Sequence, residues 1–281
     1  MKLRQDGIIP LPEGGLGNQI FIYMAGYVSS EHLKCPLYIL NNNPTHHSNL
    51  DYKNSIFRNI GKHVNHNVYN IKSNENFKHY QFHDQTKEQG YDEWKIESIK
   101  PGMILQSYFQ YYKPFHKYEE KIREILLHGL QSFILKVKDM CNFDDSGFIH
   151  VRRGDYLHFQ DRHFIQPIEY YIHCLRELHK LKPNIKTIYL ISDDVLWLKE
   201  NKSSFSQDNN IFNFKIIETN DELEALSIMT LCKEGAICAN STFGWWGAYL
   251  GAYKYRNPVF APKKWYSTKN IEIFPEEWII V

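Results

Sequence analysis

The alternation of apolar and polar positions is most regular in the second half of the chain. Short apolar runs there are separated by stretches in which apolar residues recur with the spacing of helices that bury one face. Strands that alternate with helices are typical of βαβ units, which build a parallel sheet. The pattern predicts strands at 148–151, 185–192, 214–217, 235–239 and, as the last strand, 258–261, and helices from Pro167, from about Val195, at 221–232 and at 248–253.

The first half of the chain is less regular. Two prolines limit residues 7–12 to at most a short edge strand, because proline cannot donate to a ladder. Helical spacing over 20–28 follows a glycine-rich stretch and predicts a helix with Asn18 at its N-cap. The other elements predicted here are strands at 36–40 and 103–106, helices from about Pro114 and at 133–140, and short apolar runs at 68–71 and 80–82 in a polar, irregular region.

A short polar segment, 141–147, separates the two patterns and contains residues that favour turns. The chain has 281 residues, a length that allows two domains. We therefore expect an N-terminal α/β domain over 1–140 and a C-terminal α/β domain over 147–281.

The net charge of the chain is +1, which argues against an extended surface for nucleic acid but allows a local anion site. The cysteines form neither a CxxC pair nor a zinc pattern, so we expect reduced and mostly buried thiols, as in a cytoplasmic protein. These cysteines are Cys35, Cys141, Cys174, Cys232 and Cys238.

Membrane insertion is not predicted, since no segment reaches the roughly 20 apolar residues of a span. The N-terminus does not lead into the apolar core of a signal peptide. We expect a soluble cytoplasmic protein, with peripheral attachment to a membrane and the oligomeric state left open.

Polar and charged residues follow directly after the predicted strands of the second half. Because the carboxyl ends of parallel strands meet at one rim of a sheet, we expect these residues to lie close together, where open α/β sheets bind their ligands. The residues are His150, Arg152, Arg153 and Asp155 after the first strand, Ser192, Asp193 and Asp194 after the second, and Asn240, Ser241 and Thr242 after a third.

These side chains suit the parts of a nucleotide diphosphate. Guanidinium groups such as those of Arg152 and Arg153 bind phosphate oxygens, and carboxylates bind a ribose diol or a guanine edge. A Ser-Thr turn that opens a helix also suits a phosphate oxygen. A purely structural interpretation exists for each group, because Asp193, Asp194, Ser241 and Thr242 are also good helix N-caps.

The glycine-rich stretch Gly14–Gln19 opens a helix, where a backbone can approach an anion or a polar ligand. It lacks the third glycine of the dinucleotide fingerprint and the Lys-Ser/Thr of a P-loop. The chain also lacks an Asp-x-Asp, an HExxH, a GxSxG and a zinc set. If a diphosphate leaves here, arginines and a helix N-terminus must neutralise it, so we expect neither a metal nor another cofactor.

Five stretches of the chain, in order, resemble the signatures of glycosyltransferase family 11, the α-1,2-fucosyltransferase family. The resemblance covers about residues 14–281 and implies a GT-B fold, in which two Rossmann-like domains face each other across a cleft. It also implies that the C-terminal domain holds GDP-fucose, the N-terminal domain serves the acceptor, and transfer inverts the anomeric centre without a metal. The stretches are Gly14–Gln19, Ser107–Gln110, His150–Tyr156, Ser192–Asp194 and Asn240–Ala248.

The resemblance also implies roles for single residues. His150 is placed beside the guanine or ribose, Arg152 and Arg153 at the diphosphate, and Asp194 at the guanine. The catalytic residues are expected to be Arg152, Asp155 and Asn18, although the general base stays open between Asp155, Glu13 and water. Further donor contacts are expected from Gly15, Gly17, Gln19, Asp193, Asn240, Ser241 and Thr242.

The expected reaction is transfer of L-fucose from GDP-fucose to a galactose-type hydroxyl, which forms an α-1,2 linkage in a glycan. One alternative is a related transferase that uses another GDP-sugar or makes another linkage. A second is a binding module for glycans or nucleotides that has lost catalysis, which the pair Arg152 and Arg153 disfavours because a glycan binder needs no diphosphate site. The region 41–100 has little recognisable pattern, and the identity of the acceptor stays open.

Overall fold

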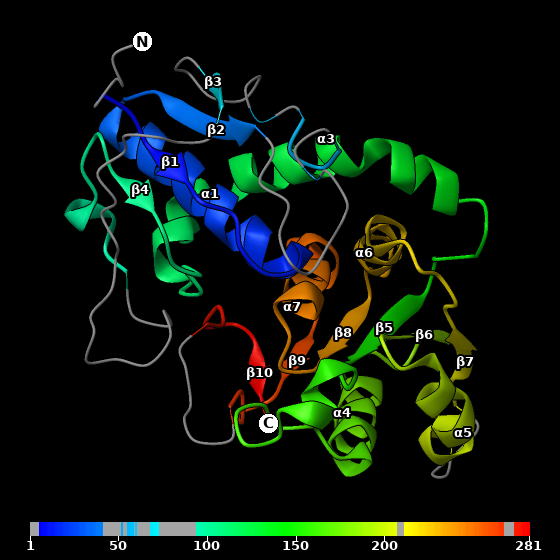
Figure 1. Cartoon of the computed structure of the whole chain (residues 1–281). Coiled ribbons are helices and arrows are strands. Elements are labelled where there is room, and N and C mark those ends of the chain that lie inside the picture. Colours follow the sequence, from blue (N-terminus) through cyan, green and yellow to red (C-terminus); the bar gives the residue numbers. More distant parts are fainter. Residues whose placement is uncertain are drawn as a thin grey trace. The chain divides into compact units, whose positions relative to one another are not determined.

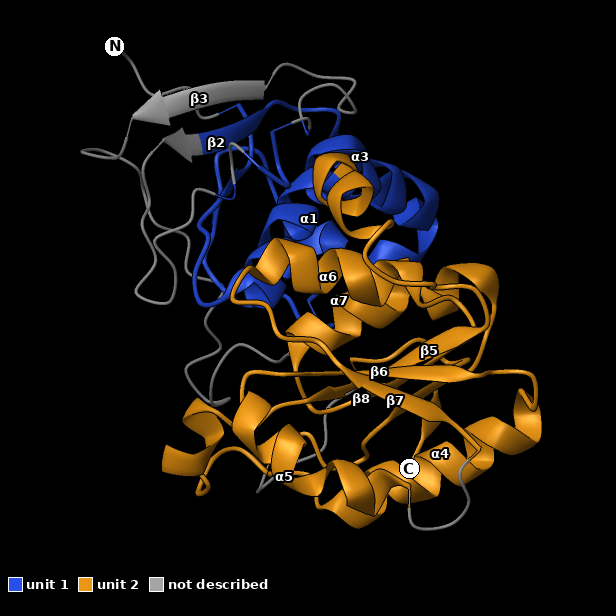
Figure 2. Cartoon of the chain, turned by 90° about the vertical axis from the view of Figure 1, so that its right-hand side faces the viewer, with its two compact units in different colours: residues 1–130 blue, residues 131–281 orange. Residues whose placement is uncertain are grey.

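The computed structural model describes residues 6–41, 52, 55–58, 60, 68–72, 94–206, 211–266 and 273–281. The chain forms two compact units, Met1–Leu130 and Gln131–Val281, which Figure 2 shows in different colours. The segment 141–147, where we expected a domain junction, lies inside the second unit. The roles expected for the two domains stay predictions, and the apolar run at 80–82 lies outside the described residues.

A six-stranded parallel sheet forms the centre of the second unit (Figure 1). Its spatial order, β7-β6-β5-β8-β9-β10, is the 3-2-1-4-5-6 order of the Rossmann fold when the strands are counted along the chain. The chain adds strands on one side of β5 and then crosses to the other side, so the order reverses between β5 and β8. The strands are β5 (Ser146–Val151), β6 (Thr187–Ser192), β7 (Asn213–Ile216), β8 (Gly235–Cys238), β9 (Val259–Ala261) and β10 (Ile279–Ile280).

Helices cover both faces of this sheet, with α6 and α7 on one side and α4 and α5 on the other (Figure 2). The face towards α4 and α5 is apolar, because Ile149 and Val151 of β5 pack there with Ile237 of β8 and are almost fully buried. The alternation of side chains along a strand places His150 on the opposite face. The helices are α4 (Ile168–Leu181), α5 (Val195–Phe205), α6 (Glu222–Leu231) and α7 (Thr242–Leu250), with short 3-10 turns η4 (Asp155–His158) and η5 (Ala252–Tyr255).

The first unit contains a smaller parallel arrangement. Strand β1 pairs with β4, β2 pairs with β3, and a single bridge between Ile8 and Leu37 joins the two pairs. The proline-rich segment therefore forms only a short strand, as predicted. The elements are β1 (Ile9–Pro10), α1 (Leu16–Leu33), β2 (Leu37–Asn41), β3 (Val68–Lys72), η2 (Ile96–Ser98), β4 (Ile104–Leu105) and η3 (Lys113–Tyr118). Helix α3 (Glu119–Val137) follows and continues past Leu130 into the second unit.

Two helix predictions in the first half were wrong. Helix α1 begins at Leu16 with Gly15 as its N-cap, so Asn18 lies in the first turn instead of at the cap. The prediction used the apolar spacing over residues 20–28. Leu16 is also buried, so the apolar face of the helix begins one turn earlier. The two helices predicted from about Pro114 and at 133–140 are one helix, α3, preceded by a 3-10 turn.

Two predictions at the end of the chain were also wrong. Helix α7 begins at Thr242, not at 248, because the glycines that favoured a turn are packed inside the helix. A Cβ on Gly244 would lie 2.6 Å from Nδ1 of His150, so this glycine lets α7 approach β5. Strand β9 is not the last one. Strand β10 follows it and pairs with β9, and the backbone N–H of Val281 donates to the carbonyl of Ala261 over 2.9 Å. A strand of two residues is too short to show a hydrophobic period in the sequence.

The cysteines are free thiols, and all of them except the half-buried Cys141 are buried, as predicted. None of the helices in the described ranges combines the length and the apolar character that crossing a bilayer requires.

The central sheet predicts where stability is most sensitive. Ile149 is fully buried between the sheet and α4, so Ile149→Ala should lower the free energy of unfolding by about 2–5 kcal/mol. Urea unfolding followed by far-UV circular dichroism measures this change. Leu181→Ala, at a side chain that is 54% exposed, is the control and should change stability by less than about 0.5 kcal/mol. Equal losses in the two variants would contradict the packing described.

Candidate functional site

The carboxyl ends of β5, β6 and β8 lie side by side in the second unit. Val151 of β5 is in register with Ser192 of β6, and His150 is in register with Cys238 of β8. The polar residues that follow the three strands therefore gather at one rim, next to the reversal of strand order between β5 and β8. Ligands of open α/β sheets bind at this position.

Arg152 lies at the centre of this rim. Its Nη2 donates to Oδ1 of Asp155 over 2.5 Å, and its Nη1 lies 2.8 Å from Oδ2 of Asp193. Its Cζ is 5.2 Å from the ring centroid of Tyr156. Burial opposes the charge of Arg152, but Asp193, Tyr156 and Asp155 outweigh that effect and raise the pKa of the guanidinium. The side chain is therefore a permanent cation in a partly buried position.

Arg153 contacts different residues from those that Arg152 contacts. Its Nε donates to Oδ2 of Asp194 over 3.1 Å, and its Cζ lies 4.7 Å from the ring centroid of Trp197 in α5. The two consecutive arginines thus contact different parts of the rim.

Asp193 connects the turn after β5 to the end of β6. One of its carboxylate oxygens accepts from the backbone N–H of Arg153 over 2.9 Å, and the other faces Arg152. A Cβ on Gly154 would lie 2.4 Å from Oδ2 of Asp193, so only glycine leaves room for this carboxylate. Asp193 therefore holds the two arginines in place. The sequence predicted a ligand contact for Asp193 and did not predict this structural role.

Asp194 is the N-cap of α5, and its Oδ1 accepts from the backbone N–H of Trp197 over 3.0 Å. Its other oxygen accepts from Arg153. The structural interpretation of this residue is thus confirmed, and its predicted contact with a guanine stays a prediction.

The N–H groups of Arg152 and Arg153 that the aspartates leave unused can bind an anion. The contacts with Asp155 and Asp193 engage two of the five N–H donors of the Arg152 guanidinium, and Arg153 contacts a carboxylate through Nε. The remaining donors can bind oxygens of a phosphate or diphosphate. Each of the carboxylates Asp155, Asp193 and Asp194 contacts one of the two arginines, and the expectation that no metal takes part stays a prediction.

His150 lies beneath the cluster, between β5 and α7. Its ring centroid is 5.7 Å from that of Phe243, and its Nδ1 has no hydrogen-bond partner in the described part of the chain. Burial lowers the pKa of His150 to about 4, with Arg152 acting in the same direction and Asp193 against it. The imidazole is therefore neutral at pH 7.

Asn240 holds protein segments together instead of presenting its amide to solvent. It is fully buried, and its Nδ2 donates to the carbonyls of Phe164 and Trp265 over 2.8 and 2.7 Å. Its Oδ1 accepts from Gln166 over 3.3 Å. Both N–H donors of the amide are in use, so a ligand contact of this side chain would be made through Oδ1, and that contact stays a prediction.

The N-terminus of α7 follows Asn240 directly. Ser241 is the N-cap residue by its backbone, but its side chain makes no capping hydrogen bond, and Thr242 is the first residue of the helix. The first backbone N–H groups of a helix have no partners within it and attract anions. This terminus therefore faces the same rim as the arginines.

The predicted residues of the first half lie together in the first unit, at the start of α1. Nε2 of Gln19 donates to the carbonyl of Gly14 over 2.9 Å, and Nε2 of Gln110 donates to Oδ1 of Asn18 over 2.9 Å. Gly15 is the N-cap of α1 and Gly17 lies in its first turn. These residues form a polar group at the carboxyl ends of β1 and β4.

Sequence patterns missed three residues that shape these groups. Tyr156 and Gln110 stand inside stretches that were singled out but had no assigned role, whereas no motif pointed to Gln166. Tyr156 donates to the carbonyl of Asn240 over 2.9 Å, and Gln166 also donates to the carbonyl of Lys264 over 2.8 Å. A long-range hydrogen bond of this kind has no sequence spacing that would reveal it.

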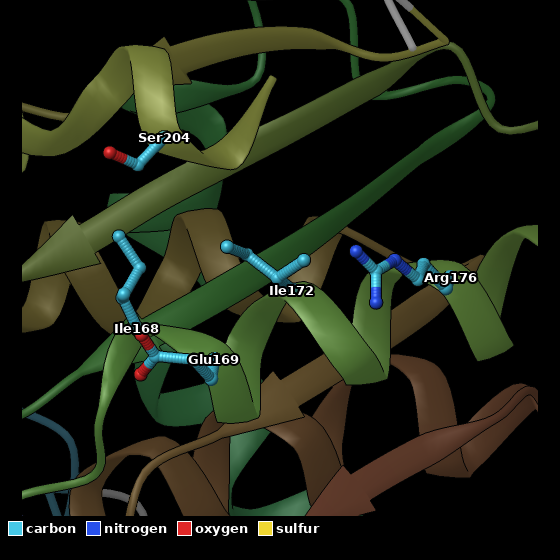
Figure 3. Close-up of a pocket in the computed structure, with 5 residues that line it drawn as sticks. All are labelled: Ile168, Glu169, Ile172, Arg176 and Ser204. Atoms are coloured by element: carbon cyan, nitrogen blue, oxygen red, sulfur yellow. The ribbon is translucent and has the colours of Figure 1, made fainter. Parts of the chain in front are cut away.

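A separate pocket of about 420 Å³ lies between α4 and α5 (Figure 3). None of the predicted site residues lines it. Its lining residues are Ile168, Glu169, Ile172, Arg176 and Ser204.

The chain matches a known protein family over most of its length. The model of the family described as "Glycosyl transferase family 11" matches residues 45–281. The O-antigen biosynthesis glycosyltransferase WbnK of Escherichia coli is 26% identical over an alignment of 309 positions, gaps included. The alignment covers 95% of this chain and 97% of that protein. An α-1,2-colitosyltransferase of Escherichia coli is 30% identical over 190 residues, covering 65% of this chain and 63% of that protein.

Solved structures with a similar fold include fucosyltransferases. The NodZ α-1,6-fucosyltransferase soaked with GDP-fucose shares 12% identity with a TM-score of 0.51, over 88% of this chain and 93% of that one. POFUT1 in complex with GDP shares 10% identity with a TM-score of 0.50, over 92% of this chain and 99% of that one. At these identities the similarity concerns the fold, and it confirms an α/β architecture with parallel sheets.

The low pKa of His150 predicts a pH dependence of stability. The folded state binds this proton less readily than the unfolded state, whose histidine has an ordinary pKa near 6.5, so stability is complete above about pH 6.5 and falls as the pH drops towards 4. The loss is on the order of 3 kcal/mol at most. Unfolding free energies of the parent and His150→Gln should therefore depend differently on pH between 4 and 7. His173→Gln, at an exposed position, is the control, and parallel curves for parent and His150→Gln would contradict the assignment.

The N-cap role of Asp194 predicts different effects for two substitutions. Asp194→Ala removes the acceptor for Trp197 and should cost about 1 kcal/mol of stability, whereas Asp194→Asn retains a good cap and should cost less. Urea unfolding measures both values. Asp161→Ala is the matched control, because the Asp161 side chain is 76% exposed. Equal destabilisation by alanine and asparagine at position 194 would show that the charge, not the cap, is what matters.

Proposed function

The chain belongs to glycosyltransferase family 11, and from this premise we propose that it transfers L-fucose from GDP-fucose to a galactose-type hydroxyl, forming an α-1,2 linkage. The observation that carries the proposal is the pair of arginines at the strand reversal. A diphosphate needs a dense set of fixed N–H donors there, and Arg152 and Arg153 supply it beside the N-terminus of α7.

The proposed reaction is a displacement at the anomeric carbon of the sugar. The acceptor oxygen forms a bond to this carbon while the bond to the diphosphate oxygen breaks, and the electron pair leaves with GDP. The configuration of the carbon inverts. Negative charge grows on the leaving diphosphate, and Arg152, held by Asp193 and Asp155, is oriented in advance to stabilise it. No metal is required in this proposal.

The other proposed roles follow from position. His150 is neutral and buried next to the rim, where it suits the guanine or ribose side of the nucleotide. Asp194 is the proposed guanine contact through lone pairs that its cap and ion pair leave available. Asn18 and Gln19 of the first unit are proposed to serve the reacting centre, which requires the two units to face each other across a cleft. The acceptor proton goes to Asp155, to Glu13 or, late in the transfer, to water.

A second donor deserves a direct test because one relative is named an α-1,2-colitosyltransferase. Colitose differs from fucose only by the absence of one hydroxyl, so a related donor site could accept either sugar. If a protein group hydrogen-bonds that hydroxyl, the enzyme should strongly prefer fucose, because the protein group is left unpaired when colitose is bound.

The proposed function is tested by a screen of donors and acceptors. The purified chain is incubated with EDTA and GDP-fucose, GDP-colitose, GDP-mannose or UDP-galactose, with and without lactose. We expect GDP release that depends on GDP-fucose and lactose, and a product whose NMR spectrum shows an α-1,2 link. If GDP-colitose is the one donor that turns over, colitose replaces fucose as the proposed donor sugar. Loss of activity in EDTA would contradict the metal-free reaction. Ligand binding without turnover would favour a non-catalytic module.

The role of Arg152 predicts a large effect on turnover. Arg152→Ala should lower kcat by about 10²–10³ and weaken GDP binding less, because the interaction is strongest when charge develops on the leaving group. Arg152→Lys keeps the charge but loses the planar fork, so it should also be strongly impaired. Arg162→Ala is the matched control, since that side chain is 62% exposed. Transfer by folded Arg152→Ala within about threefold of the parent rate would disprove the role.

A further inference from the structure

Tyr156 lies next to Arg152 and contacts it through its ring. The Cζ atom of Arg152 is 5.2 Å from the ring centroid, which is within the range of a cation–π interaction. The two carboxylates that bind Arg152 contact its N–H groups, and the Cζ atom of the same guanidinium lies over the ring of Tyr156. The carboxylate contacts and the ring contact together restrict the direction of the Arg152 side chain more than either does alone.

The contact between Arg152 and Asp155 cannot fix the guanidinium by itself. The Asp155 side chain is 46% exposed, and ion pairs at such positions contribute little and are screened by salt. Asp193 is better anchored, because the backbone N–H of Arg153 also holds it. A second firm contact is needed to fix the direction of a long side chain, and Tyr156 supplies it.

The ring of Tyr156 is itself held on two sides. It stacks on the imidazole of His163 with centroids 4.2 Å apart and ring planes 11° apart, and its hydroxyl donates to the backbone carbonyl of Asn240 over 2.9 Å. Burial lowers the pKa of His163, so this imidazole is neutral at pH 7 and adds no positive charge beside Arg152. The stack is therefore compatible with a cation at the Tyr156 ring.

Asn240 connects this tyrosine to the rest of the rim. Its amide donates to the carbonyls of Phe164 and Trp265, and Gln166 donates both to Asn240 and to the carbonyl of Lys264. Three segments meet here, namely the loop from β5 to α4, the turn from β8 to α7, and residues 264–266. A buried, satisfied network of this kind is rigid, so the hydroxyl of Tyr156 is attached to a fixed point.

We propose that Tyr156 is a positioning residue for Arg152, and that its own position is set by the carbonyl of Asn240 and the ring of His163. This inference rests on the proposed role of Arg152 at a diphosphate. Tyr156 touches neither the sugar nor the nucleotide in this scheme and acts only through the arginine.

The test is a double-mutant cycle between Tyr156 and Arg152 in the full chain. Tyr156→Leu removes the ring and the hydroxyl, and should weaken GDP binding and lower kcat/KM for GDP-fucose about 5- to 20-fold, as loss of a partly buried cation–π contact predicts. Tyr156→Phe keeps the ring over Arg152 and should lose only about 2- to 4-fold from the missing hydrogen bond. In the Arg152→Ala background, Tyr156→Leu should have no further effect beyond about twofold.

A matched control comes from a tyrosine far along the chain. Tyr255 in η5 also lies under cations, with Lys233 and Lys254 each 5.2 Å from its ring centroid, and it is 46% exposed. Tyr255→Leu should leave GDP affinity and kcat/KM unchanged. Circular dichroism and thermal unfolding verify that each variant is folded.

The outcomes separate a positioning role from a structural one. An equal loss from Tyr156→Leu with and without Arg152 would show that the tyrosine acts through general stability, and parent-like values in Tyr156→Leu would show that it does not act at all. Both results overturn the inference. The affinity for GDP is measured with GDP alone, in the absence of a donor sugar. If Arg152→Ala weakens GDP binding but the parent transfers no fucose, the proposed fucose transfer is overturned, and the double-mutant cycle on GDP affinity still tests the role of Tyr156. No effect of Arg152→Ala on GDP binding or turnover would overturn both proposals.

Discussion

The ion pairs between the ends of β5 and β6 are the interaction on which the rest of the site depends. Asp193 contacts both the side chain of Arg152 and the backbone N–H of Arg153, so it fixes the turn that presents the two arginines. This geometry requires that the strands be parallel neighbours and that position 154 be glycine. Carboxylate partners lower the free-energy cost of holding two arginines close together in partly buried positions before a ligand binds.

Residues of the rim divide into those that hold the structure and those that can contact a ligand. Asn240, Gln166 and Asp193 use their polar atoms to connect protein segments. Arg152 and Arg153 keep N–H donors that these connections leave available. The division explains why a rim with so many polar residues can be rigid, and rigidity is what preorganised stabilisation of a leaving group needs.

Sequence patterns were most successful where one physical rule dominates. Buried parallel strands are nearly continuous apolar runs, so strands β5 to β9 were predicted within about two residues of their observed bounds. The residues after β5, β6 and β8 were correctly expected at one rim. Patterns failed where packing decides. Gly244 and Gly247 favour a turn by themselves, but both are packed inside α7, and β10 exists only through its pairing with β9.

The sequence by itself determined the α/β class, the family and the set of charged residues at the rim, because periodicity and short motifs depend on neighbouring positions along the chain. Tertiary structure decided what each of those residues does. Asp194 caps a helix, Asn240 uses both of its N–H donors internally, and Tyr156 faces Arg152, and none of these facts has a signature in local spacing. The physical reason is that hydrogen bonds and ring contacts between segments distant in sequence depend on strand order and register, which a linear pattern does not contain.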